Sequence, residues 1–260
     1  MTSTVNSSDG TAIAFDRLGN GPPVILTSGA FNTRETTAPL AAALQDRFTV
    51  FNYDRRGRGD SGDTRPYSLE REIEDIDGLI GAAGGTAALF GYSSGGTLAL
   101  KAAAHGLPIA KLALYDVPFL VDDSHQRLPA DFAAQLSRLI AAGKQGEAVE
   151  LYQRVAVGIP EQVVAQMRNA PFRPALEAIA HTLAYDAAVV GDLGFPAELI
   201  GSITVPTLVI DGENSPPIMH GAAEALARTL PNGRRCTLPG QTHDIAPDAT
   251  AAVLTEFLSS

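Results

Sequence analysis

Short apolar runs alternate with helical segments along most of this chain of 260 residues. The runs span residues 24–27, 48–53, 86–92, 111–115 and 205–211, and a further strand is expected at 234–238. Apolar runs of this length are typical of strands that are buried on both faces of a parallel sheet. Helices between such strands cover the faces of the sheet. The alternation therefore predicts an α/β fold with a mostly parallel central sheet.

Two regions depart from this alternation. Residues 3–7 and 11–17 alternate apolar and polar side chains around Asp9-Gly10, a dipeptide that favours a tight turn, so an antiparallel hairpin is expected at the N-terminus. Between 118 and 204 the strand pattern stops, and helices are expected at 129–142, 146–157, 161–169 and 174–189. The chain therefore divides into an α/β core, residues 1–117 and 205–260, and a helical insertion, residues 118–204.

Charge and composition exclude several classes of protein. The 19 Lys and Arg against 29 Asp and Glu give a net charge of −10, which argues against a basic nucleic-acid binder. The single cysteine, Cys236, cannot form an internal disulfide, so a reducing compartment is expected. Because no leader pattern and no long uncharged apolar run occurs, we expect a cytoplasmic protein without a membrane partner.

The segment Gly91-Tyr92-Ser93-Ser94-Gly95 lies between a predicted strand and a predicted helix. In a G-x-S-x-G sequence of this kind, a sharp turn presents the serine hydroxyl above the sheet, and small neighbours let the backbone pass. Ser93 is therefore the candidate nucleophile. The same turn directs the amide of Ser94 toward a developing oxyanion.

A second glycine-rich segment, Gly57-x-Gly59-x-x-Gly62, matches a dinucleotide-binding fingerprint when taken out of context. In a dinucleotide-binding turn the glycines open directly into a helix that holds the pyrophosphate. Here Asp63-Thr64-Arg65-Pro66 intervenes before any helix can begin, so the setting disfavours nucleotide binding.

With these motifs in place, the chain resembles the α/β-hydrolase family over nearly its whole length. Residues 54–61 are similar to the D-x-R-G-x-G-x-S turn after the family's fourth strand, and residues 27–30 stand where the family has its His-Gly oxyanion turn. The helical insertion matches the cap that follows the family's sixth strand. The resemblance implies an oxyanion hole formed by the backbone amides of Ala30 and Ser94.

A serine hydroxyl needs a neighbouring base to become a good nucleophile. Of the five histidines, only His243 follows the last predicted strand in a loop, where the family keeps its base, and Ser93 precedes it as in the family's chain order. The other four histidines are explained more simply as helix-capping, packing or surface residues, although His181 could face the pocket. These others are His105, His125, His181 and His220.

The acid departs from the family's usual pattern. The family commonly has an aspartate shortly after the seventh strand, where this chain has Ser215. A minority of the family has its acid after the sixth strand, as some lactone hydrolases do, and there the chain has Asp116. We therefore expect Asp116 to be the acid, with Asp211, Glu213 or no acid at all as alternatives. Asp244, next to the predicted base, is expected to point away from it.

The substrate is expected to be a small uncharged ester or lactone, cleaved through an acyl-enzyme. Phe31, Tyr92 and Phe119 adjoin the catalytic positions and are candidates to line an apolar pocket, although each could equally be core. A lyase or cyclase on the same fold, or a non-catalytic binding protein, stays an alternative. No cofactor, metal or nucleic-acid partner is implied, and we expect a monomer or homodimer.

Overall fold

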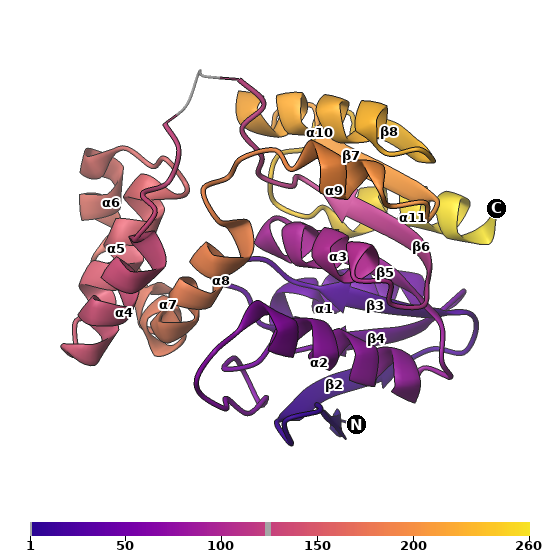
Figure 1. Ribbon diagram of the computed structural model, residues 1–260, viewed down its shortest axis with the longest axis horizontal. Helices are drawn as coiled ribbons and strands as arrows, with labels where there is room; N and C mark the ends of the chain where they lie inside the picture. Colours follow the sequence, from indigo (N-terminus) through magenta and orange to yellow (C-terminus); the bar gives the residue numbers. More distant parts are fainter. Residues whose placement is uncertain (1, 123–125) are drawn as a thin grey trace.

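The computed structural model describes residues 2–122 and 126–260, whose strands form one eight-stranded sheet in the order β1-β2-β4-β3-β5-β6-β7-β8 (Figure 1). The strands are β1 (Thr2–Asn6), β2 (Ala12–Leu18), β3 (Pro23–Thr27), β4 (Thr49–Tyr53), β5 (Ala87–Tyr92), β6 (Ile109–Tyr115), β7 (Thr207–Gly212) and β8 (Gly233–Leu238). The pairs β1–β2 and β2–β4 are antiparallel, and every other neighbouring pair in this sheet is parallel. The predicted α/β fold with an N-terminal hairpin is confirmed.

Helices cover both faces of the sheet. The helices α1 (Arg34–Leu44) and α11 (Pro247–Ser259) bury their apolar side chains against one face, in a cluster that includes Leu40, Val50 and Leu254. The other face is covered by α2 (Leu69–Ala82), α3 (Ser94–Ala104) and α10 (Pro217–Thr229). Burial of the central strands on both faces explains their continuous apolar sequence.

The segment between β6 and β7 is mainly helical, and its first helices lie to one side of the sheet (Figure 1). Its elements are α4 (Phe132–Ala141), α5 (Gln145–Val155), α6 (Glu161–Met167), α7 (Arg173–Ala178), the short 3₁₀ helix η1 (Ala180–Thr182), α8 (Leu183–Val190) and α9 (Ala197–Gly201). Side chains of α4, α5 and α8 form a third apolar cluster. The ends of the segment meet where Leu120 donates a hydrogen bond to the carbonyl of Leu193, at 2.7 Å.

Three details of the helix prediction were wrong. The single helix predicted at 174–189 is divided into α7, η1 and α8, because the backbone of Ile179 leaves the α-helical region with φ −106° and ψ 11°. Helix α9 was missed, since five residues carry too little periodicity to be recognised. The Ala- and Leu-rich run at 39–44 predicts a helix over that range only, whereas α1 already begins at Arg34 and contains Pro39 on its exposed side.

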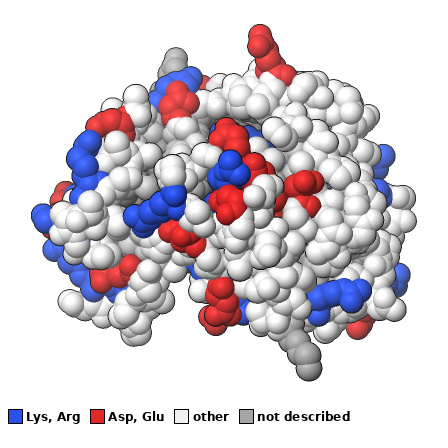
Figure 2. All heavy atoms as spheres, turned by 60° about the horizontal axis from the view of Figure 1, so that its bottom comes forward, with Lys and Arg blue, Asp and Glu red and all other residues white. Residues whose placement is uncertain are grey.

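Charged side chains of both signs are interspersed on the surface shown in Figure 2, which is mostly uncharged. This arrangement agrees with the net charge of −10, which gives no electrostatic basis for holding a polyanion. Among the described residues, no helix is long and apolar enough to cross a membrane.

Candidate active site

Ser93 stands at the strained turn between β5 and α3. Its backbone has φ 54° and ψ −126°, a region that residues with a side chain rarely adopt and that costs roughly 1–3 kcal/mol. The turn is packed tightly, because a Cβ atom on Gly95 would come within 2.4 Å of the carbonyl oxygen of Ser28. The amide of Ser93 donates to the carbonyl of Tyr115, at 2.9 Å, which ties the turn to β6. Ser93 is therefore held in one position above the sheet.

His243 contacts Asp116 across the carboxyl ends of the strands. The Nδ1 atom of His243 lies 3.0 Å from Oδ2 of Asp116, whose side chain is fully buried while that of His243 is 32% exposed. The imidazole also packs against the ring of Tyr92, with centroids 5.1 Å apart, beside the strained serine. With Nδ1 engaged by a carboxylate, Nε2 is left as the nitrogen that can accept a proton.

Ser93 and His243 share no hydrogen bond in the structure, and the described residues offer the serine hydroxyl no other partner. In free enzymes a nucleophile and its base often stand further apart than in the complex with substrate, and the bond forms when substrate binds. The arrangement is therefore compatible with a base and nucleophile that engage during the reaction.

Ser215 has a role that the sequence did not reveal. Its hydroxyl donates to Oδ2 of Asp116 at 2.6 Å and accepts from the amide of Gly212 at 3.2 Å. The oxygen of Asp116 that faces His243 is therefore held from two sides. The available signal in the sequence was the place of Ser215 at the position where the family commonly has its acid.

The alternative acids have other partners. Asp211 is fully buried and accepts hydrogen bonds from Arg235, at 3.0 and 2.7 Å, while its Oδ2 lies 2.6 Å from Nδ1 of His220. Glu213 accepts from the amide of Gly240, and Asp244 is exposed. Among the carboxylates of the described residues, Asp116 is the one that contacts His243.

The ion pair at Asp211 predicts how stability depends on pH. Burial by itself would raise the pKa of Asp211, but hydrogen bonds from Arg235, His220 and Thr237 lower it below its ordinary value. Because the folded pKa lies below the unfolded value of about 3.9, the pair stabilises the fold above about pH 4, and that contribution is lost as the pH falls through the folded pKa. Asp211→Asn is expected to cost about 2 kcal/mol at pH 7 and progressively less in acid, measured by thermal unfolding.

The control for this prediction is Glu224→Gln, which removes an exposed ion pair with Arg228. Exposed pairs contribute about 0–1 kcal/mol, so this variant should follow the wild type at every pH. A constant difference between Asp211→Asn and the wild type from pH 7 down to pH 3 would contradict the assignment.

The two amides expected to form an oxyanion hole are unpaired. Neither the amide of Ala30 nor that of Ser94 donates a hydrogen bond to any described residue, and Ser94 is 2% exposed. Ser94 is the first residue of α3, where helical amides lack an internal acceptor. The loop of Ala30 lies against the serine turn, because a Cβ atom on Gly29 would come within 2.8 Å of Cβ of Ser93. Two free donors thus accompany the serine.

The three aromatic candidates for the pocket wall have different surroundings. Phe31 is half-buried and meets the ring of Tyr152 edge-on at 5.4 Å, between the core and the insertion. Tyr92 is 6% exposed beside His243. Phe119 is 2% exposed and packs in the core cluster against Phe195, so it offers little surface to a substrate.

Residues 19–256 match the sequence profile of the α/β hydrolase family. The chain belongs to the α/β hydrolase family. The crystal structure of an α/β hydrolase from Sphaerobacter thermophilus is similar, with 54% identity and a TM-score of 0.93, over 98% of this chain and 100% of that chain.

Two relatives of this α/β hydrolase carry the names of specific enzymes. The 2-(acetamidomethylene)succinate hydrolase of Mesorhizobium japonicum is 26% identical over 258 residues, which cover 93% of this chain and 90% of the relative. The pimeloyl-[acyl-carrier protein] methyl ester esterase of Stenotrophomonas maltophilia is 29% identical over 266 residues, which cover 94% and 96%. The relatives of this α/β hydrolase thus include hydrolases and an esterase.

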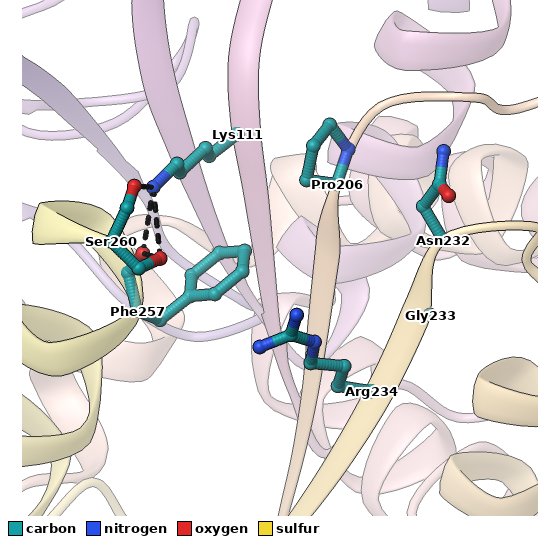
Figure 3. A pocket seen from close by; sticks show the side chains of 7 residues that line it. All are labelled: Lys111, Pro206, Asn232, Gly233, Arg234, Phe257 and Ser260. Carbon is teal, nitrogen blue, oxygen red and sulfur yellow. Dashed lines mark hydrogen bonds between the residues drawn. The ribbon is translucent and has the colours of Figure 1, made fainter.

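Two cavities of this α/β hydrolase lie apart from the predicted site residues. One, of about 450 Å³, opens between residues 65–67 and the helices α4 and α8, where the rings of Tyr67 and Tyr185 stack with centroids 4.1 Å apart. The other, of about 350 Å³, lies at the amino ends of β6, β7 and β8, where Lys111 donates to two carbonyls in the last turn of α11 and to that of Ser260 (Figure 3). Ser93, Asp116 and His243 line neither cavity.

The other three histidines in the described part of this α/β hydrolase lie outside the group formed by Ser93, Asp116 and His243. His105 ends helix α3, and His220 is bound to Asp211. His181 contributes to the cavity beside Tyr67, and burial lowers its pKa. His125 lies outside the described residues. No group of three His, Cys, Asp or Glu side chains in the described part of the chain is arranged to hold a metal ion.

Proposed function

We propose that this α/β hydrolase cleaves a carboxylic ester or lactone through an acyl-enzyme intermediate. The hydroxyl oxygen of Ser93 attacks the carbonyl carbon while Nε2 of His243 takes its proton. His243 then returns that proton to the alkoxy oxygen as the ester bond breaks. A water molecule, activated by the same nitrogen, hydrolyses the acyl-serine and regenerates the free hydroxyl.

The contact of 3.0 Å between His243 and Asp116 is the observation that carries this proposal. A buried carboxylate at Nδ1 holds the imidazole in the tautomer that can accept a proton at Nε2, and it stabilises the imidazolium that forms. The strained turn at Ser93 supports the role of nucleophile, since such strain commonly accompanies function.

The unpaired amides of Ala30 and Ser94 supply the oxyanion hole in this mechanism. Backbone donors that are already in place stabilise the negative oxygen without reorganisation, and each contributes a factor of about 10²–10³ in kcat. Because both donors are main-chain groups, the serine at position 28 in place of the family's histidine does not affect this function.

An uncharged substrate fits the apolar surroundings. Phe31 and Tyr92 are proposed as walls of the acyl site, and the insertion at residues 118–204 as the cap that covers it. Similarity to a methyl ester esterase, 29% identical over 94% of this chain, favours esters as the first substrates to test.

Covalent labelling with a fluorophosphonate tests the proposal. The probe should attach one phosphonyl group to the folded protein, and mass spectrometry of the digested protein should locate it on Ser93. Esters and lactones of graded acyl size, assayed in parallel, then define the substrate class. Attachment at another residue, or a folded protein that neither reacts with the probe nor hydrolyses any of the substrates, would contradict the proposal.

A further inference from the structure

The turn after β4 carries three arginines that are almost completely buried. Arg55, Arg56 and Arg58 are each 1% exposed. A buried guanidinium is costly unless it is paired, so each needs a carboxylate or carbonyl partner. In the motif D-x-R-G-x-G-x-S, Arg56 occupies the arginine position, whereas Arg55 and Arg58 occupy variable positions. The motif therefore gives no reason for the burial of these two.

Arg55 and Arg58 meet at one carboxylate of the helical insertion. Asp186, on α8, is fully buried; its Oδ1 accepts from Arg55 at 2.7 Å and its Oδ2 from Arg58 at 2.6 Å. Oδ1 also accepts from the hydroxyl of Ser94, at 2.8 Å. Burial alone would raise the pKa of Asp186, but the two arginines outweigh it and lower that pKa, so the carboxylate is charged.

Glu72 completes the balance of charge. It binds Arg55 through both oxygens, at 2.7 Å each, so the cluster holds two guanidinium groups and two carboxylates. Its charges are thus neutralised inside the protein, as a buried ionic cluster requires. Such a cluster has a fixed geometry, because a displaced partner would leave a charge without compensation.

Arg58 also binds the loop that contains Ala30, whose amide is one of the two unpaired donors. Its Nη1 donates to the carbonyl of Gly29 at 2.5 Å and to that of Asn32 at 3.2 Å. The carbonyl of Gly29 and the amide of Ala30 belong to the same planar trans peptide and point in opposite directions. Fixing that carbonyl therefore fixes the direction of the Ala30 amide. A cation at the oxygen also polarises the peptide and strengthens its N–H as a donor.

The contacts of Arg58 indicate what holds it in place. Its Nε is buried without a partner among the described residues, whereas both terminal nitrogens are bound. The unpaired Nε costs free energy and does nothing to hold the side chain. The contacts of the two terminal nitrogens are therefore what fixes the position of Arg58. Those contacts are with Asp186 and with the loop at Gly29.

We propose that Arg58 and Asp186 are positioning residues that set both donors of the oxyanion hole. Arg58 holds the peptide whose amide belongs to Ala30, and Asp186 holds Arg58 and the side chain of Ser94. Because Asp186 lies on α8, the insertion and the oxyanion hole are fixed as one unit. This inference rests on the proposed function, because it concerns the donors that would stabilise the oxyanion in ester cleavage.

Arg58→Met tests the first half of the inference, since methionine keeps much of the length of the side chain and removes every donor. We expect kcat for a model ester to fall about 10–100-fold with KM nearly unchanged, because the donors act on the transition state. A trifluoromethyl ketone, which forms a tetrahedral adduct with the serine, should bind more weakly by a similar factor. The corresponding methyl ketone, as a weak ground-state analogue, should lose little affinity.

Asp75→Asn is the matched control. Asp75 is 1% exposed and pairs with Arg56 at 2.7 Å, and within the described residues none of the hydrogen bonds of Arg56 reaches the loop at Gly29. Asp75→Asn removes a comparable buried charge, so the melting temperature of this variant should fall. Its kcat and its affinity for the trifluoromethyl ketone should stay within about twofold of the wild type. Equal catalytic losses in both variants would show a merely structural effect and overturn the inference.

Ser94→Ala tests the second half and gives a measurement if Arg58→Met does not fold. It keeps the amide of Ser94 and removes only the hydroxyl that binds Asp186. The trifluoromethyl ketone should bind several-fold more weakly, with little change in melting temperature. If the wild type hydrolyses esters, unchanged kcat and inhibitor affinity in Arg58→Met would overturn the inference. If Arg58→Met does not fold, the same result in Ser94→Ala would overturn it. A wild type without turnover or labelling would instead remove the proposed function itself.

Discussion

Ser93→Ala is expected to lower kcat for ester hydrolysis by about 10⁶-fold, the scale on which loss of a nucleophilic serine acts in a serine protease. The alanine variant lacks the oxygen that forms the acyl-enzyme, and the hydroxyl of the adjacent Ser94 is bound to Asp186 instead. Labelling by a fluorophosphonate should vanish with the activity. Steady-state kinetics on the best ester of the screen measures the loss.

The strained backbone at Ser93 provides the control for this prediction. Glycine adopts φ 54° and ψ −126° without the steric conflict that a Cβ causes, whereas alanine retains it. Ser93→Gly should therefore be as inactive as Ser93→Ala but more stable, by about 1 kcal/mol or more, in chemical unfolding. Substantial turnover in either variant would exclude Ser93 as the nucleophile.

Much of the fold could be predicted because its signals are local. Each central strand is buried on both faces, so its apolar run is visible in a short stretch of sequence, as at Pro23–Thr27 and Thr207–Gly212. The turn at Ser93 is equally local, since the strand, the small residues and the helix follow one another within the segment. The hairpin at the N-terminus depends on a single turn.

The choice of acid could not be settled from the sequence because it depends on contacts between distant loops. Asp116 and His243 are separated by 127 positions, and their contact depends on how the loops after β6 and β8 meet. Asp211 follows the same strand pattern as Asp116 one strand further on, yet Arg235 and His220 bind it instead. Local sequence contains no information on which carboxylate each histidine reaches.

The buried ionic cluster around Asp186 could not be predicted from the sequence, for a related reason. A family motif names the residues that its members share, and Arg58 stands at a position where the motif allows any residue. Its partner, Asp186, lies 128 positions further along, within a helix whose other residues are mainly apolar. A charged residue in such a helix was the available signal, because a buried carboxylate implies a cationic partner.

Asp116→Asn is expected to lower kcat about 10⁴-fold with little change in KM, as the equivalent change does in a serine protease. The amide of asparagine can donate to Nδ1 of His243, which would place the imidazole proton on Nε2, where it blocks transfer from Ser93. Glu213→Gln is the control, since Glu213 binds the amide of Gly240 and not the histidine. Full activity in Asp116→Asn, with loss in Glu213→Gln or Asp211→Asn, would show that the acid lies elsewhere.

Ser215 makes the same prediction testable by recovery of activity. Its hydroxyl lies 2.6 Å from the oxygen of Asp116 that faces His243, so we expect a carboxylate introduced at position 215 to reach the same imidazole nitrogen from the loop after β7. The double variant Asp116→Asn with Ser215→Asp should therefore regain about 10-fold or more of the kcat lost in Asp116→Asn. Ser215→Ala alone should lose only about 10-fold, because Asp116 loses one hydrogen bond and keeps its charge, although the amide of Gly212 also loses its acceptor. Recovery in the double variant would show that His243 requires a negative charge beside Nδ1. It would also show that this charge need not come from position 116.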